Sequence, residues 1–192
     1  MMLDSNDRGK MLLSIARMAI SRTLHVSYAL EGVGENIAWL SRPGATFVTL
    51  MLDGELRGCI GSLQANVPLI DDVSNNAVAA AFHDPRFIPL SANELETVAI
   101  EVSLLSELQP VKFCTEADVL MQLRPHIDGV VFEYESQRST FLPQVWESIS
   151  SPQQFLVGLK NKAQIPEDFW SENIRLLRYT VNKWSETDNT QE

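Results

Sequence analysis

A cysteine between two glycines and beside an arginine is the part of this sequence best suited to chemistry. The run Leu56–Leu63 contains Arg57, Gly58, Cys59 and Gly61. The thiolate is the reactive form of cysteine, and a neighbouring cation lowers the pKa of a thiol. Two glycines so close together in an extended segment indicate that something approaches the backbone. The run predicts either a site at Cys59, with both glycines beside a ligand, or a tightly packed strand holding an inert thiol.

The sequence supplies no obvious base for this thiol. A nucleophilic cysteine normally needs a base that a third group orients. The three histidines are His25, His83 and His126, and no motif connects any of them to Cys59. A catalytic Cys–His pair is therefore the less favoured interpretation.

Glu101 is the second candidate, because a carboxylate in the middle of an apolar strand is costly unless it is paired or hydrated. Ala99 and Ser103 lie on the same face of the predicted strand and are small, which leaves room for a ligand or for Arg57 or Arg86. We therefore consider Glu101 as a catalytic acid, base or orienting group. The alternative is a carboxylate that points into water.

Arg86 lies in the turn Asp84–Phe87, where proline fixes the backbone and Phe87 is suited to anchoring the loop. A guanidinium displayed in this way suits a carboxylate or a phosphate. A salt bridge to Asp84 or Glu101 is an equally good interpretation.

Asn76 precedes the small residues Ala77–Ala81 in a predicted helix. Asparagine is a poor helix former because its side chain competes for backbone hydrogen bonds. We expect a close helix–sheet contact here. A structural hydrogen bond from Asn76 is favoured over a role in the site.

No metal or cofactor is expected. The sequence has no CxxC, HExxH or EF-hand pattern, no Walker motif and no GxGxxG run. Its two cysteines are too few for the cysteine triad that holds a radical SAM cluster.

The composition is that of a globular domain. The 192 residues are 45% hydrophobic and 21% charged, and we treat 1–192 as one domain with its core over about 8–185. No apolar run reaches the roughly 18–20 residues of a membrane span, and the polar N-terminus does not read as a signal peptide. The thiols Cys59 and Cys114 suit a reducing compartment, so we expect a cytoplasmic protein.

The charge argues against two classes of partner. Fifteen Lys and Arg residues stand against 25 acidic residues, for a net charge of −10. Nucleic-acid binding depends on neutralising phosphates, so DNA or RNA is not an expected partner. An anionic membrane surface is excluded for the same reason.

The elements that position the candidates are predicted by apolar periodicity. A helix is expected over 8–25, capped by Asn6 or Asp7, with Arg17 and Arg22 in water. A hairpin over 46–63 turns at Asp53-Gly54 and places Leu50 opposite Arg57 and Val48 opposite Cys59, so that Arg57, Cys59 and Gly61 share one face. The remaining expected elements are a loop at 31–44, helices at 68–82, 115–123 and 152–162, strands at 97–106 and 176–184, a hairpin of strands at 130–134 and 139–142, and a disordered tail at 186–192.

Strands and helices alternate without a regular βαβ rhythm. This pattern predicts an α+β fold with a mainly antiparallel sheet flanked by helices.

Six blocks occur in order along the chain: Gly54–Gly61, Asn76–Phe82, Asp84–Leu90, Ile100–Ser103, Phe141–Trp146 and Lys162-Ala163. Together they resemble the AMMECR-one domain family, called AmmeMemoRadiSam system protein A in prokaryotes. The resemblance implies a sheet with packed helices and a smaller inserted lobe, which we place at roughly 110–145. It also makes Lys162, at a helix end that suits a cation, a candidate ligand-binding residue, although Gln164 replaces the glycine usual in the family.

Two functions remain open, and the sequence leaves undecided whether the protein is an enzyme. The first is a small-molecule enzyme or ligand binder, with a cleft around Cys59, Arg57, Arg86 and Glu101 that takes a small anionic ligand. The second is a non-catalytic partner module. It follows from the resemblance, because family members are often encoded beside Memo-like and radical SAM proteins.

Overall fold

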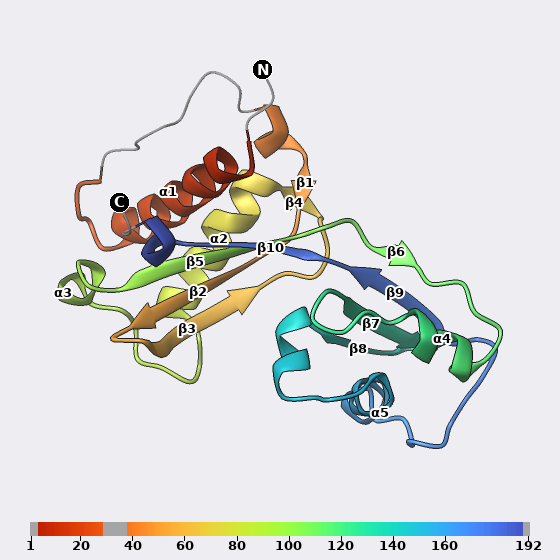
Figure 1. Cartoon of the computed structure of the whole chain (residues 1–192). Helices are drawn as coiled ribbons and strands as arrows, with labels where there is room; N and C mark the ends of the chain where they lie inside the picture. The colour runs from red at the N-terminus through yellow and green to blue at the C-terminus, as the bar shows by residue number, and fades with distance from the viewer. Residues whose placement is uncertain (1–3, 29–37, 190–192) are drawn as a thin grey trace. The chain divides into compact units, whose positions relative to one another are not determined.

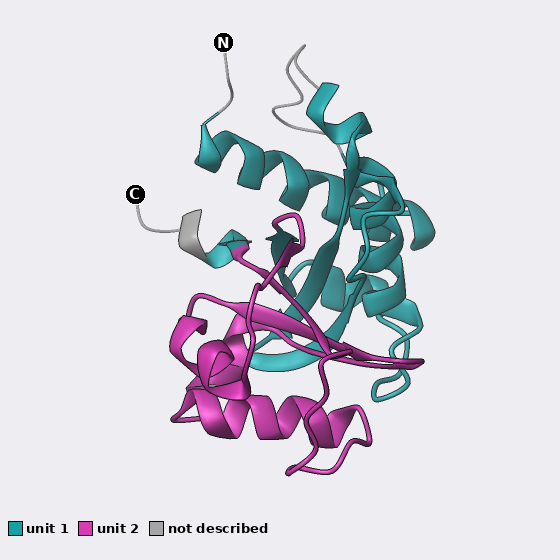
Figure 2. Ribbon diagram, turned by 90° about the vertical axis from the view of Figure 1, so that its right-hand side faces the viewer, with its two compact units in different colours: residues 1–105, 182–192 teal, residues 106–181 magenta. Residues whose placement is uncertain are grey.

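The computed structural model describes residues 4–28 and 38–189. The chain divides into two compact units (Figure 2), and each is treated by itself. Unit 1 comprises residues 1–105 and 182–192, and unit 2 comprises residues 106–181. Both contain helices and antiparallel strand pairs, which confirms the predicted α+β class. Most of the loop predicted at 31–44 lies outside the described residues.

Unit 1 contains a four-stranded sheet with the order β10-β5-β2-β3. Its strands are β2 (Thr46–Leu52), β3 (Glu55–Gly61), β5 (Ala99–Leu105) and β10 (Val181–Ser185), and β1 (Pro43–Gly44) pairs separately with β4 (Val67–Pro68). The helices are α1 (Ser5–Thr23), α2 (Leu69–Phe82) and α3 (Ala92–Leu95), with short 3-10 turns η1 (Ala38–Ser41) and η3 (Glu186–Asn189). No helix in the described part of the chain is long and apolar enough to cross a bilayer.

The predicted first helix begins earlier than expected. Asp4 is the N-cap of α1, because its backbone is extended and its side chain accepts a hydrogen bond from the Asp7 N–H at 2.8 Å. Asn6 and Asp7 are therefore inside the helix, and the prediction that one of them is the cap is wrong.

Helices α1 and α2 pack on one face of the sheet (Figure 1). Val48, Leu50, Ile100 and Val102 are fully buried and belong to the same apolar cluster as the inner faces of both helices. Because side chains alternate along a strand, the residues between them lie on the opposite, outer face of the sheet.

A β-bulge changes the register of the β2–β3 hairpin. Asp53 and Gly54 have φ angles of 52° and 83° and form the predicted turn. Beyond it the register shifts, so that Leu50 pairs with Gly58 and Arg57 is the extra residue. The predicted pairing of Leu50 with Arg57 is therefore wrong. Arg57 does not share the face of Cys59, which pairs with Thr49 rather than Val48.

Unit 2 is built around a second four-stranded sheet, with the order β6-β9-β7-β8. Unit 2 runs over 106–181, whereas the lobe predicted from the sequence is roughly 110–145. Its later end lies well beyond 145 because β9 (Arg175–Tyr179) pairs with β7 (Gly129–Tyr134). The predicted closing strand at 176–184 is two strands in two sheets, β9 and β10. The elements of unit 2 are β6 (Gln109–Pro110), α4 (Glu116–Gln122), β7 (Gly129–Tyr134), β8 (Gln137–Phe141), η2 (Pro143–Glu147), α5 (Pro152–Lys162) and β9 (Arg175–Tyr179).

The two glycines of β3 allow close approach by the chain itself. A Cβ on Gly58 would lie 2.2 Å from the carbonyl oxygen of Ala80 in α2, and one on Gly61 would lie 2.3 Å from the ring of Phe47. The close approach predicted from the sequence is present, and these neighbours account for it without a ligand.

We expect Gly58→Ala to lower the free energy of unfolding by about 2 kcal/mol, because the added methyl group forces α2 away from the sheet. Urea denaturation measures the change. Gly54→Ala is the comparison variant, since nothing lies within 4 Å of its Cβ and only its positive φ is strained, at a cost of about 1 kcal/mol. A Gly58→Ala protein no less stable than Gly54→Ala would contradict close packing at Gly58.

Candidate functional site

Four polar side chains cross the outer face of the unit 1 sheet, one from each strand. Thr49 lies directly opposite Cys59 on one side and Glu101 on the other, so all three side chains point the same way. Lys183 of β10 continues the line, because its Nζ lies 2.7 Å from Glu101 Oε2. We call Lys183, Glu101, Thr49 and Cys59 the polar row.

The polar row is partly open to solvent. The Lys183 and Glu101 side chains are 47% and 19% exposed, and Thr49 and Cys59 are half-buried. The Thr49 hydroxyl donates to Cys59 Sγ at 3.3 Å. The sequence allowed two positions for Glu101, in water or beside Arg57 or Arg86, and the structure shows neither. Glu101 is paired with a lysine that the sequence analysis did not consider.

The backbone of Cys59 is held by the loop after α2. β3 is an edge strand, so its outward N–H and C=O groups have no neighbouring strand. The Asp84 carboxylate accepts the Cys59 N–H at 2.9 Å, and Arg86 donates to the Cys59 carbonyl at 3.2 Å. These two side chains take the place of a fifth strand at this residue.

Arg86 is committed to Asp84 through two side-chain bonds of 2.9 and 2.7 Å. These bonds, opposed by burial and helped by the Cys59 N–H, hold the pKa of Asp84 well below its usual range. The pKa of Arg86 is raised, mainly by Asp84 and to a lesser extent by Cys59. Of the two interpretations of Arg86, the structure contains the salt bridge to Asp84.

Arg57 is also paired within the chain. Its Nε lies 2.8 Å from Glu94 Oε1, and its guanidinium lies 6.0 Å from the centre of the Phe87 ring. Glu94 in turn accepts the N–H and hydroxyl of Ser91 in the capping box of α3. The Arg57 bond is the main cause that lowers the pKa of Glu94 to about 2. Arg57 is therefore an anchor for the 84–94 segment.

Asn76 belongs to a buried network that joins α2 to β2. Its Nδ2 donates to the Thr46 carbonyl and to Asp72 Oδ2, each at 3.0 Å. The same Asp72 oxygen accepts the N–H and hydroxyl of Thr46 at 2.7 Å, and Ser62 donates to the other oxygen. The structure thus gives Asn76 the structural hydrogen bonds that the sequence analysis favoured.

Lys162 belongs to unit 2, whereas the other candidate residues belong to unit 1. Its Nζ donates to the Thr140 carbonyl at 3.0 Å and lies 5.3 Å from the centre of the Phe141 ring.

The AMMECR1 family profile matches residues 13–184, almost the whole chain. The chain belongs to the AMMECR1 family. A relative from Methanothermobacter thermautotrophicus is 35% identical over 188 residues, covering 95% of this chain and 96% of that protein. One from Aeropyrum pernix is 37% identical over 197 residues, covering 97% and 81%. The crystal structure of the uncharacterized Pyrococcus horikoshii protein PH0010 has a TM-score of 0.77 at 27% identity, covering 93% of this chain and 91% of that one.

The family resemblance predicted from the six sequence blocks is thus confirmed. The structure explains two of the blocks together: the Gly54–Gly61 run of this AMMECR1 domain and its Asp84–Leu90 loop are bound to each other through Cys59 and Arg57.

Sequence reasoning missed Lys183 and Thr49 as members of the polar row. Lys183 lies between Asn182 and Trp184 in a segment of alternating character, and Thr49 lies between Val48 and Leu50. Alternation alone assigns both to the face opposite the core. It could not show which strands lie side by side, and this decides their neighbours.

The row holds no nucleophile–base pair. Thr49, the hydrogen-bond partner of the Cys59 thiol among the described residues, is not a base. The Glu101 strand lies two strands from β3, at roughly 10 Å. Within the described part of the chain, no group of three or more His, Cys, Asp or Glu side chains could hold a metal ion.

Asp84→Asn should lower the free energy of unfolding of the AMMECR1 domain by about 3 kcal/mol, because it removes the charge of a buried carboxylate that binds Arg86 and weakens the acceptor for the Cys59 N–H. Urea denaturation at pH 7 gives the value. Asp71→Asn, an exposed position on α2, is the control and should change stability by no more than about 0.5 kcal/mol. The contacts of Asp84 and Arg86 with the Cys59 backbone form a clamp on β3. Equal effects of the two substitutions would contradict this clamp.

Stability should fall as the pH is lowered below about 5. The pKa values of Asp84 and Glu94 are depressed in the folded state, so the unfolded chain binds protons at these carboxyls first. Their contribution is present above the unfolded pKa and is lost as the pH falls through the folded pKa, about 2 for Glu94. Glu94→Gln should flatten this slope, as measured by urea denaturation between pH 2.5 and 6. The exposed Glu96→Gln is the control, and a slope unchanged by Glu94→Gln would argue against the ion pair with Arg57.

Proposed function

We propose that this AMMECR1-family protein is a binding module for a small polar molecule and that the polar row is its binding surface. One observation carries the proposal: four polar side chains, one per strand, line the face of the sheet that the helices of unit 1 leave open. The clamp on the Cys59 backbone fixes one end of the row, and a fixed scaffold lowers the entropic cost of binding.

The same geometry favours binding over chemical conversion. Cys59 bonds to a hydroxyl, and Glu101 is held by Lys183. General acid–base work requires a group within hydrogen-bond reach of the proton it moves, and Glu101 is two strands from the thiol. Cys59 is therefore a contact group for the ligand in this proposal.

The charges indicate the chemistry of the ligand. The guanidinium groups of Arg57 and Arg86 are not part of the polar row: they bind Glu94 and Asp84 in the segment that holds the edge of β3. Lys183, at 47% exposure, is the cation of the row, and Glu101 beside it accepts hydrogen bonds. A small molecule with an anionic group and a neighbouring amino or hydroxyl donor complements this pair.

A second candidate function is the partner module implied by the family resemblance, acting with Memo-like and radical SAM proteins. One observation favours it. Ile88, in the loop clamped to β3, is 79% exposed, and a rigid loop that displays a large apolar side chain suits a protein contact. In this case Ile88→Ser should abolish co-purification with the partners while ligand binding at the polar row persists.

Binding is tested by following backbone amide shifts during titration with glycine, which has both groups, and with acetate, which lacks the amino group. Glycine at millimolar concentration should shift the amides of the polar row, and acetate should shift them less. Lys183→Met should weaken glycine binding at least fivefold, whereas Lys162→Met, in unit 2, should leave it unchanged. Shifts scattered over both units, or equal losses in the two variants, would overturn the proposal.

The thiol should be accessible in the folded protein. In a Cys114→Ser background, we expect iodoacetamide to label Cys59 without denaturant, because the residue is half-buried on the outer face. Glycine should slow the labelling. Mass spectrometry gives the rate. Labelling only after unfolding would show that Cys59 is a packing residue and remove it from the binding surface.

A further inference from the structure

The Lys183–Glu101 pair depends on how β10 lies beside β5. β10 has five residues and is an edge strand, so β5 alone holds it within the sheet. A slip of one residue would turn Lys183 to the helix face and bring Asn182 or Trp184 to the outer face. Something must therefore select the observed register.

Trp184 supplies one part of this selection. A Cβ on Gly9 of α1 would lie 2.3 Å from the Trp184 ring, so the ring packs against the helix at the glycine. Trp184 thus belongs on the helix face, and its neighbour Lys183 on the outer face.

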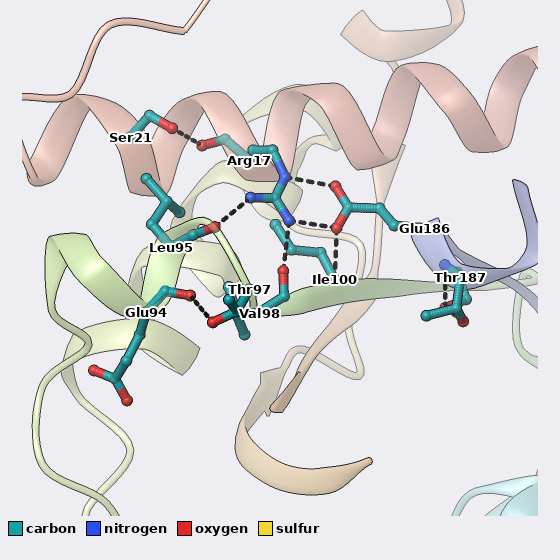
Figure 3. Close-up of polar contacts among 10 residues, drawn as sticks. Arg17, Ser21, Glu94, Leu95, Thr97, Val98, Ile100, Glu186 and Thr187 are labelled. Carbon is teal, nitrogen blue, oxygen red and sulfur yellow. Dashed lines mark hydrogen bonds and ion pairs between the residues drawn. The ribbon is translucent and has the colours of Figure 1, made fainter. Parts of the chain in front are cut away.

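A polar cluster just beyond the strand supplies a stronger constraint (Figure 3). Arg17 of α1 binds both oxygens of Glu186, at 2.6 and 2.5 Å, and donates to the carbonyls of Leu95 and Val98, at 2.8 and 2.7 Å. Glu186 Oε2 also accepts the Ile100 N–H at 2.8 Å. Arg17 is therefore not in water, and Glu186 is not part of a disordered tail. The prediction that Arg17 lies in water is wrong, and so is the predicted start of the tail at Glu186, while residues 190–192 of that tail lie outside the described residues.

The positions of these contacts along the chain matter. Ile100 directly precedes Glu101, and Glu186 follows Lys183 by three residues. The cluster therefore joins the two backbones that carry the ion pair, at one point on each. The side chains of Arg17 and Glu186 are only 17% and 25% exposed, and partial burial strengthens such bonds relative to those in water.

We infer that Arg17 and Glu186 are positioning residues that hold β10 in the register in which Lys183 meets Glu101 on the binding surface. The geometric part of this inference stands on contacts within unit 1. Its meaning for ligand binding rests on the proposed function.

The test measures the geometry of the pair directly. A carbodiimide activates a carboxyl group, which then forms an amide with an amine held beside it, and the Lys183–Glu101 cross-link is quantified by mass spectrometry of the digest. Arg17→Met and Glu186→Gln should each lower its yield at least fivefold. Arg22→Met, an exposed arginine on the same helix, should change it less than twofold.

Two controls separate loss of register from unfolding. Iodoacetamide labelling of Cys59 in the Cys114→Ser background reports on the rest of unit 1 and should change less than twofold. If Arg17→Met does not fold, Arg17→Lys keeps the charge without the forked guanidinium and should still lower the cross-link yield at least twofold. Yields within twofold of wild type in every folded variant would overturn the inference.

The outcome is separable from that of the proposed function. If glycine binds nowhere on the sheet but the cross-link still depends on Arg17 and Glu186, the positioning role stands and the binding role fails. If both are correct, Glu186→Gln should weaken glycine binding at least threefold, and adding it to Lys183→Met should have no further effect, because the two act on one contact.

Discussion

An edge strand leaves backbone groups unpaired, and the structure of unit 1 depends on how this is resolved at β3. The Asp84 carboxylate takes the Cys59 N–H while Arg86 takes the Cys59 carbonyl. A carboxylate that is 2% exposed requires strong partners, and Asp84 has the guanidinium and two backbone N–H groups. One buried charge therefore closes the sheet edge and sets the path of the chain after α2.

The opposite edge of the sheet is secured by the same kind of chemistry. Arg17 and Glu186 bind the segments around β5 and the end of β10, and Glu186 accepts a backbone N–H as Asp84 does. In both places an arginine–carboxylate pair is used mainly to satisfy backbone groups. Forked guanidinium geometry suits this role better than the single charge of a lysine.

Because Arg57 and Arg86 bind carboxylates of the chain, the candidate site is the outer face of the sheet and not a cleft between Cys59 and these two arginines. Arg57 lies near Cys59 in the sequence and Arg86 is brought to its carbonyl by the fold, but their guanidinium groups are paired with Glu94 and Asp84. The outer face instead carries Lys183, Glu101, Thr49 and Cys59, where Lys183, paired with Glu101, is the cation. The motif around Cys59 thus acts as a scaffold on its backbone side, and in the proposed function its thiol side faces the ligand.

The sequence by itself determined the α+β class, the family, the Asp53-Gly54 turn and the close approach to the two glycines, because these follow from periodicity, backbone preferences and motif order. It misplaced Arg57 because a bulge adds one residue to a strand without any marker in an alternating pattern. It missed Lys183 because the partner of that residue lies in β5, about eighty residues away. Strand order and the pairing of charges are properties of the assembled sheet, so only the tertiary structure decided which polar groups meet.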